Sequence, residues 1–329
     1  MKEFTYVRPA AVIEAVTLRA GRPGSRYLAG GTNLVDLMKI GVEQPDELID
    51  VTGLGMDRIE TTLDAGLRIG AAVSNSDLAV HPAVRQDFAA LSQAILSGAS
   101  GQLRNMATVG GNLLQRTRCA YFADISLPCN KRNPGSGCPA LAGEHHNHAI
   151  LGWSEHCVAT HPSDMVVALM AYDATVEAHT PSGPVRIPIS DFYRPVADTP
   201  HLETTLPEHA LITGVTVPPA PPASSRYRKV RERASFAFAT GSVAAALTVR
   251  AGAVHAVRIA LGGAASHPWR ASTAEAALLG EPATEDSFAK AAAAELAEAR
   301  PLPHNQYKVA LLRDLIVAVL GDLAVEAGA

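Results

Sequence analysis

The sequence predicts an α+β protein with more than one domain, and three observations carry this prediction. At 329 residues, the chain exceeds the size at which one hydrophobic core usually stops growing. Up to about residue 217, short strand patterns alternate with helical patterns. After a proline-rich segment, PPAPPASS at 218–225, long strand patterns are followed by alanine-rich helical ones. We therefore expect a mixed N-terminal region and an α+β C-terminal domain.

Composition and charge exclude several classes of protein. Hydrophobic residues make up 47% and charged residues 18% of the chain, as in ordinary globular proteins. The formal net charge of -4 gives no electrostatic reason to expect a nucleic-acid partner. No apolar run is long enough to span a membrane, and the N-terminus MKEFTYVRPAAVIEAVTL lacks the apolar core of a signal peptide. We expect a cytoplasmic protein, or a periplasmic one if a partner with a signal carries it there.

The first hundred residues predict strands and helices in alternation. A strand at 27–29 leads through two glycines into a helix that Asn33 is placed to cap. ELIDV, from Glu47, and LRIGAAV, from Leu67, have the composition of strands. Residues 74–96 have apolar side chains at spacings of three and four, which predicts helical structure.

The rest of the chain is divided by the proline-rich segment. HPSDMVVALMAYDA predicts a helix that starts at Pro162 and Ser163. Three strands should follow at 174–180, 185–189 and 210–217. Beyond the prolines, strands are predicted for RYRKVRER, GSVAAALTVRAG and AVHAVRIALGG, and the last helix, 307–325, has an apolar stripe.

Two glycine-containing turns are candidates for ligand binding. AGGTNL, Ala29–Leu34, lies between a strand and a helix, where backbone amides at the helix start suit a pyrophosphate. TVGGN, Thr108–Asn112, repeats this arrangement before another helical stretch. Either turn alone is also compatible with a plain turn. No P-loop is present, and GSGCPA at 135–140 fits the dinucleotide pattern without the strand that the pattern requires.

All four cysteines fall in one irregular stretch with the spacing C-x9-C-x8-C-x18-C. Four thiolates suffice for a 4Fe-4S cluster, and a loop rich in Gly and Pro can wrap one. Two disulfides are also possible by count. A zinc site is a further alternative, although the stretch has no CxxC motif; its nitrogen ligands would come from His145, His146, His148 and His156. Unlinked thiols are the last alternative.

Four motifs in this order and spacing resemble the FAD-binding subunits of the xanthine dehydrogenase and molybdenum hydroxylase family. They are AGGTNL, TVGGN, HPSDMVVALMAYDA at 161–174 and YRKVRERASFAFA at 227–239. The resemblance covers essentially the whole chain. It implies a PCMH-type FAD-binding fold with two α/β subdomains, 1–55 and 56–217, the second with a loop insertion at 117–158. It also implies a C-terminal domain of the CO dehydrogenase flavoprotein type at 224–329.

The resemblance further implies which residues hold FAD. The two turns would bind its pyrophosphate, Asp164 a ribitol or ribose hydroxyl, and Ile212 would make a backbone contact. Lys229 would lie near the flavin ring and favour an anionic reduced flavin. From the residues alone, Asp164 can also be a helix N-terminal charge and Lys229 a solvated strand charge. The implied FAD-binding set is Ala29, Gly30, Gly31, Thr32, Asn33, Leu34, Thr108, Gly110, Gly111, Asn112, Asp164, Ile212 and Lys229.

The insertion resembles those of two 4Fe-4S-containing groups of FAD subunits, the bacterial molybdenum-dependent aldehyde oxidoreductases and 4-hydroxybenzoyl-CoA reductase. The wording CNKRNPGSGC, with HAILG and HPSD downstream, is closer to the aldehyde-oxidising group. The implied cluster ligands are Cys119, Cys129, Cys138 and Cys157. In this interpretation the four histidines are loop residues and not ligands.

The resemblance implies an electron-transfer subunit of a heterotrimer. A large partner would oxidise an aldehyde at a molybdenum cofactor, and a small partner would relay electrons through 2Fe-2S clusters. FAD in this chain would then pass them to an external acceptor. No catalytic residue is expected here, because no nucleophile or general-base pattern is visible. The alternatives are reversed electron flow, as in 4-hydroxybenzoyl-CoA reductase, a zinc-stabilised scaffold, and a self-contained flavin oxidase.

Overall fold

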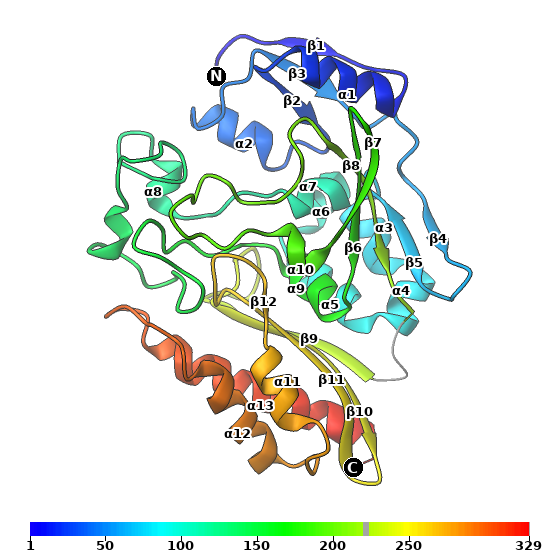
Figure 1. Cartoon of the computed structure of the whole chain (residues 1–329), viewed down its shortest axis with the longest axis vertical. Coiled ribbons are helices and arrows are strands. Elements are labelled where there is room, and N and C mark those ends of the chain that lie inside the picture. The colour runs from blue at the N-terminus through cyan, green and yellow to red at the C-terminus, as the bar shows by residue number, and fades with distance from the viewer. Residues whose placement is uncertain (220–223, 329) are drawn as a thin grey trace.

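Three β-sheets organise the computed structural model, which describes residues 1–219 and 224–328 (Figure 1). The first sheet is parallel, with the order β1-β3-β2, and contains β1 (Thr5–Val7), β2 (Ser25–Leu28) and β3 (Glu47–Asp50). Its parallel strands are connected by two helices, α1 (Val12–Gly21) and α2 (Leu34–Lys39). The predicted proline-rich connector lies partly outside the described residues, and Ser224 and Ser225 at its end belong to a strand.

The second sheet is antiparallel, with the order β4-β5-β8-β6-β7. Its strands are β4 (Ile59–Thr61), β5 (Leu67–Gly70), β6 (Thr175–Thr180), β7 (Gly183–Pro188) and β8 (Leu211–Val217). Between β5 and β6 the chain forms most of the helices of this region. They are α3 (Asn75–Val80), α4 (Pro82–Asp87), α5 (Ala89–Ser97), α6 (Gly101–Met106), α7 (Val109–Leu113), α8 (Ala120–Ala123) and α9 (Asp164–Ala171), and α10 (Ile189–Phe192) follows β7.

The helical stretch predicted over 74–96 is confirmed, and the structure divides it into the three short helices α3, α4 and α5. Pro82 occupies the first turn of α4, where proline fits, and it disfavours helical geometry in the residue before it. The helix start predicted at Pro162 and Ser163 is confirmed. The Ser163 hydroxyl accepts a hydrogen bond from the amide of Val166 at 3.1 Å and so caps α9.

The C-terminal domain is an antiparallel sheet covered by helices. The sheet has the order β12-β11-β10-β9, from β9 (Ser224–Val230), β10 (Gly241–Arg250), β11 (Ala253–Gly262) and β12 (Trp269–Arg270). The helices α11 (Ser272–Leu278), α12 (Glu285–Leu296) and α13 (Tyr307–Glu326) lie along it in Figure 1. The strand predicted for RYRKVRER ends at Val230, so Arg231 and Arg233 lie outside it.

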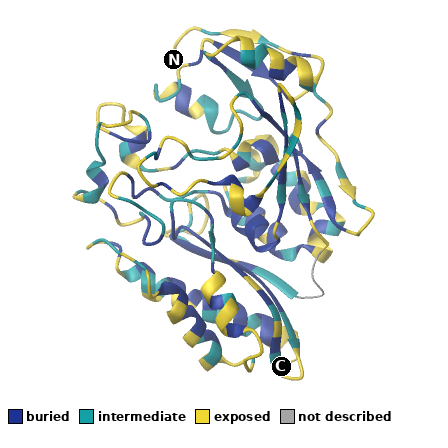
Figure 2. Ribbon diagram, viewed as in Figure 1, coloured by how far each residue is buried: buried dark blue, intermediate teal, exposed yellow. Residues whose placement is uncertain are grey.

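Two large hydrophobic cores hold the described residues together (Figure 2). One core lies under both N-terminal sheets, so the two predicted subdomains share it. The other core belongs to the C-terminal domain, and α13 contributes buried residues at the three- and four-residue spacing expected from its apolar stripe. Ile150 and Leu151 from the insertion are buried in this second core, which anchors the end of the insertion to the C-terminal domain.

The insertion, 117–158, is mostly irregular, as its composition predicts. It contains α8 and a short 3₁₀ turn, Pro139–Leu141. His145 stacks on His304 with ring centroids 4.5 Å apart, and His146 stacks on Tyr307 at 4.7 Å. These two histidines therefore dock the insertion on the C-terminal domain. Within 1–219 and 224–328, no helix has the length and apolar character that crossing a membrane requires.

Candidate functional site

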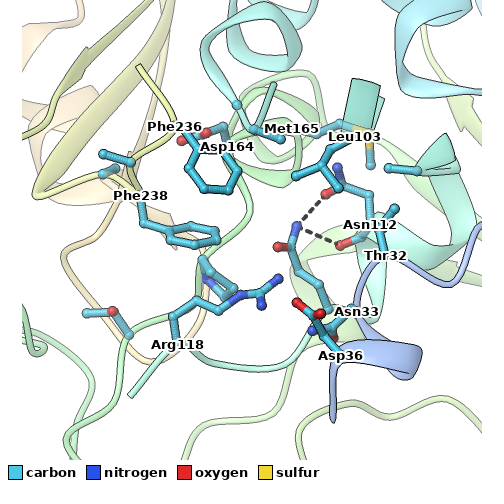
Figure 3. Close-up of a pocket in the computed structure, with 18 of the residues that line it drawn as sticks. Thr32, Asn33, Asp36, Leu103, Asn112, Arg118, Asp164, Met165, Phe236 and Phe238 are labelled. Atoms are coloured by element: carbon cyan, nitrogen blue, oxygen red, sulfur yellow. Dashed lines mark hydrogen bonds between the residues drawn. The ribbon is translucent and has the colours of Figure 1, made fainter. Parts of the chain in front are cut away.

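A cleft of about 870 Å³ lies where the N-terminal region, the insertion and the C-terminal domain meet (Figure 3). Its volume is in the range of sites for large organic ligands. Each of these parts of the chain contributes lining residues, from the turn before α2 to the segment after β9. Seven of the predicted FAD-binding residues line it, namely Gly31, Thr32, Asn33, Gly111, Asn112, Asp164 and Lys229.

The other six predicted FAD-binding residues do not line the cleft. These six described residues are Ala29, Gly30, Leu34, Thr108, Gly110 and Ile212. A Cβ atom on Gly30 would lie 1.6 Å from the carbonyl oxygen of Met106, so only glycine lets these two backbone segments pack. Ile212 is 4% exposed in the N-terminal core, and its β8 position pairs with Ala178.

The two turns differ in detail from their sequence predictions. The glycines of TVGGN lie inside α7 and do not precede it, because Thr108 is the N-cap and its hydroxyl accepts from the Gly111 amide at 3.2 Å. Asn33 stands at the N-cap of α2, but its side chain makes no capping hydrogen bond. Its Oδ1 instead accepts from the amide of Arg116 at 2.8 Å. This bond leaves Asn33 Nδ2 as a buried donor without a partner among the described residues.

Asp164 and Lys229 form a buried ion pair in the wall of the cleft. Lys229 Nζ donates to Asp164 Oδ2 at 2.8 Å, and the Lys229 side chain is 3% exposed. The Tyr227 hydroxyl donates to Asp164 Oδ1 at 2.5 Å. Burial raises the pKa of Asp164, and the Lys229 ammonium opposes this shift. Lys229 is therefore not the solvated strand charge that its sequence position also allowed.

Sequence reasoning missed three residues of the cleft, Arg118, Phe236 and Phe238. The guanidinium carbon of Arg118 lies 4.9 Å from the centroid of the Phe238 ring, a cation–π geometry. The two phenyl rings are 54% and 48% exposed. The signal was present in ASFAFA and in the arginine that precedes the first cysteine, but neither pattern has a chemistry that is specific without the fold.

The four cysteines line one small cavity beside the cleft. All four are free thiols, so the structure contains neither disulfide that their number allowed. Cys119 lines both this cavity and the large cleft. A hydrogen bond with Cys157 lowers the pKa of Cys138 to about 7, whereas burial raises the pKa of Cys119 to about 11. Among the described residues, no group of three or more His, Cys, Asp or Glu is arranged to hold one metal ion.

His148 is the histidine of the insertion that contacts a cysteine. Its Nε2 lies 3.2 Å from Cys119 Sγ. Burial lowers the pKa of His148 to about 4, so the imidazole is neutral near pH 7. The backbone carbonyl of His148 accepts from Lys308 Nζ at 3.0 Å, which fixes this part of the insertion against α13.

Two family models together match nearly the whole chain. Residues 2–220 match the "FAD binding domain in molybdopterin dehydrogenase", and residues 225–323 match the "CO dehydrogenase flavoprotein C-terminal domain". The chain therefore belongs to the FAD-binding subunits of the molybdenum hydroxylase family. The predicted family and α+β fold class are confirmed, and FAD is the cofactor that this family membership supports.

Among its individual relatives, the chain is similar to FAD-binding and medium subunits of aldehyde-oxidising enzymes and of carbon monoxide dehydrogenase. The chain is 51% identical to the aldehyde oxidoreductase FAD-binding subunit PaoB of Escherichia coli (strain K12), over 99% of this chain and 100% of that protein. It is 27% identical to the glyceraldehyde dehydrogenase medium chain of Sulfolobus acidocaldarius, over 86% and 84% of the two chains. Its structure matches carbon monoxide dehydrogenase from Hydrogenophaga pseudoflava with a TM-score of 0.77 at 25% identity, covering 99% of this chain and 98% of the other.

The residues of the cleft fit FAD. The cleft has room for a large ligand, and Gly31 and Gly111 let the backbone line it closely. Asn33 Nδ2 is a buried donor that lacks a protein partner, as expected for a group that meets an acceptor on a ligand. Two exposed phenyl rings offer flat apolar surface of the kind that a planar ring system packs against.

Proposed function

We propose that this chain is the FAD- and 4Fe-4S-containing electron-transfer subunit of a heterotrimeric, molybdenum-dependent aldehyde oxidoreductase. The observation that carries the proposal is 51% identity, end to end, to a relative named as the FAD-binding subunit of an aldehyde oxidoreductase. In this proposal a large subunit with a molybdenum cofactor oxidises the aldehyde. A small subunit with 2Fe-2S clusters relays the electrons, and an external acceptor receives them.

Bound FAD would supply the two-electron chemistry of the subunit, and the chain's own residues would hold and orient it. The residues in that role are those of the two turns that reach the cleft, with the Asp164–Lys229 pair in its wall. Lys229 Nζ is paired with Asp164 Oδ2 at 2.8 Å, so the pair gives the wall of the cleft two fixed polar groups with little net charge. No residue of this chain needs to act as a base or a nucleophile.

The proposal includes a 4Fe-4S cluster in this subunit, and the position of the four thiols around one cavity supports it. Each iron of a cubane takes one thiolate, and all four thiols of the chain line one cavity. The ligand atoms of one zinc ion all lie about 2.0–2.3 Å from the same ion. The four thiolates of a 4Fe-4S cluster each bind a different iron, so their sulfurs lie farther apart. The cavity has a volume of about 10 Å³, so the four cysteines must move apart, with their sulfurs still directed toward its centre, to admit a cluster.

Anaerobic purification of the chain with its partners tests the proposal. We expect FAD, iron, acid-labile sulfide and molybdenum in the complex, EPR signals of 2Fe-2S and 4Fe-4S clusters on reduction, and activity with aldehydes. Zinc without labile sulfide would overturn the cluster, and a complex without flavin would overturn the electron-transfer role. Turnover of aromatic acyl-CoA thioesters in place of aldehydes would contradict the proposed direction of electron flow and favour the reverse direction. Fractionation then decides whether the complex is cytoplasmic or carried to the periplasm by a partner.

A further inference from the structure

Arg118 is a cation of the insertion that faces the large cleft. It lines the cleft, is exposed to solvent, and directly precedes Cys119 in the chain. Figure 3 shows its side chain reaching between Phe238 and Asp36. The Phe238 ring supports the guanidinium from one side at 4.9 Å. This contact orients the Arg118 guanidinium and leaves its N–H groups free, because a cation–π interaction uses the flat face of the guanidinium.

Arg118 has no polar partner among the residues that the structure describes. The other arginines and the buried lysine of the cleft are already engaged, since Arg104 donates to Gly98 O at 2.6 Å, Arg233 to Phe236 O, and Lys229 to Asp164. Asp36 is near enough to act on the Arg118 charge but forms no ion pair with it. Five N–H donors in a fixed fork therefore point into an open cleft without an acceptor.

Asn33 provides an independent second donor in the same wall. Its Nδ2 is buried without a partner, and its Oδ1 is held by the amide of Arg116, two residues before Arg118. The segment 116–118, where the insertion begins, therefore both fixes Asn33 and presents Arg118 to the cleft. Unpartnered donors that line one cleft call for an acceptor-rich, anionic group, and a guanidinium fork matches the geometry of phosphate oxygens.

We propose that Arg118 binds the diphosphate of FAD, so that the insertion is part of the flavin site. Arg118 is then a cofactor-binding residue that the glycine turns alone do not provide. This inference depends on FAD binding and is independent of what the cysteines hold. It also explains why the insertion lies against the cleft: it supplies a positive charge that backbone amides cannot.

The test measures the dissociation constants of FAD, ADP and riboflavin for the full chain freed of FAD, by fluorescence. A charge-assisted hydrogen bond contributes about 1.5–3 kcal/mol, so Arg118→Gln should weaken FAD and ADP binding roughly 10- to 100-fold. Riboflavin has no phosphate, so its affinity should change by less than about twofold under this mechanism. Arg118→Lys keeps the charge without the fork and should fall between these limits.

Arg250→Gln is the matched control, because Arg250 is an exposed arginine of β10 that does not line the cleft. We expect it to change FAD affinity little. The proposal is overturned if Arg118→Gln binds FAD like the parent chain, or weakens riboflavin as much as FAD. An equal effect of Arg250→Gln would also overturn it, since the loss of any one positive charge would then explain the result. Equal thermal unfolding midpoints of the FAD-free variants exclude misfolding. Phe238→Leu removes the ring that positions the guanidinium and should also weaken FAD binding.

Discussion

Lys229 Nζ lies 2.8 Å from Asp164 Oδ2, and this buried ion pair joins the first residue of α9 to strand β9 across the wall of the cleft. The pair therefore connects the N-terminal region to the C-terminal domain. It also explains why the two predicted site residues behave as one unit: each neutralises the other in a place where an isolated charge would be costly.

Removing the cation alone should be strongly destabilising. Lys229→Met leaves the Asp164 carboxylate buried with the Tyr227 hydroxyl as its remaining side-chain partner, and breaking such a pair typically costs about 3–5 kcal/mol. Urea unfolding measures the loss. Lys290→Met is the control, because Lys290 is an exposed residue in an ion pair with Asp286, and its midpoint should not move. The double variant Asp164→Asn, Lys229→Met should recover part of the loss, and equal stability of Lys229→Met and the control would contradict this account.

Gly30 should be intolerant of a side chain although it does not line the cleft. A methyl group there would lie 1.6 Å from Met106 O, and the backbone of one segment must shift to accept it. We expect Gly30→Ala to lower the free energy of unfolding by about 3 kcal/mol and to weaken FAD binding, because Gly31 and Thr32 would move with it. Gly21→Ala is the control, since a Cβ there meets nothing within 4 Å. If both variants unfold alike, the close approach of the two segments does not constrain the turn.

The longer strands, the helices α9 and α13 and the two glycine turns could be predicted from the sequence, whereas β1, α1 and β4 were not predicted. AGGTNL and TVGGN carry their chemistry in backbone and short side chains, so Thr32 and Asn112 could be assigned to a ligand site without coordinates. The stretch 74–96 was predicted as helical from its apolar spacing, but its division into three helices, one of which begins at Pro82, was not predicted. The apolar spacing favours one continuous helix, but proline cannot continue a helix from the preceding turn, so a new helix begins at Pro82.

What the sequence did not predict are contacts between distant segments. Arg118 meets Phe238 across 120 positions, and Asn33 is held by Arg116 instead of capping its own helix. Arg116 and Arg118 belong to no motif, and their contacts form when the start of the insertion folds against the cleft. The ion pair of Lys229 with Asp164 is similar: both residues were singled out, but their mutual contact depends on how β9 passes α9.

His161 should make the folded protein less stable in mild acid. Burial lowers its pKa to about 3, and its Nδ1 accepts from the Ser163 amide at 3.3 Å. Below its ordinary pKa of 6.5 the unfolded chain binds a proton that the folded chain does not, so this contribution is present above pH 6.5 and is lost as the pH falls. At pH 5.5 the loss is about 1.4 kcal/mol relative to neutral pH.

The comparison of the parent chain with His161→Gln isolates this contribution, because Gln keeps an acceptor for the Ser163 amide and does not titrate. Unfolding free energies at pH 7.5 and 5.5 should differ by about 1.4 kcal/mol more in the parent than in the variant. His148, with its pKa lowered by burial to about 4, titrates in both proteins and cancels. Parallel pH dependences of the two proteins would show that His161 is not buried as a neutral imidazole.

His148 should set the reduction potential of a cluster held by the cysteines, a prediction that depends on the iron–sulfur proposal. Its Nε2 lies 3.2 Å from Cys119 Sγ, and a neutral imidazole can donate its one N–H to a thiolate there. Such a hydrogen bond stabilises the extra negative charge of the reduced cluster and raises its potential. An EPR-monitored redox titration of His148→Phe should therefore show a more negative midpoint with iron and FAD contents unchanged. His156→Gln is the control, because His156 lines the same cavity without a side-chain hydrogen bond to a cysteine among the described residues. A midpoint that stays constant in His148→Phe while the iron is retained would mean that the imidazole does not act on the Cys119 sulfur.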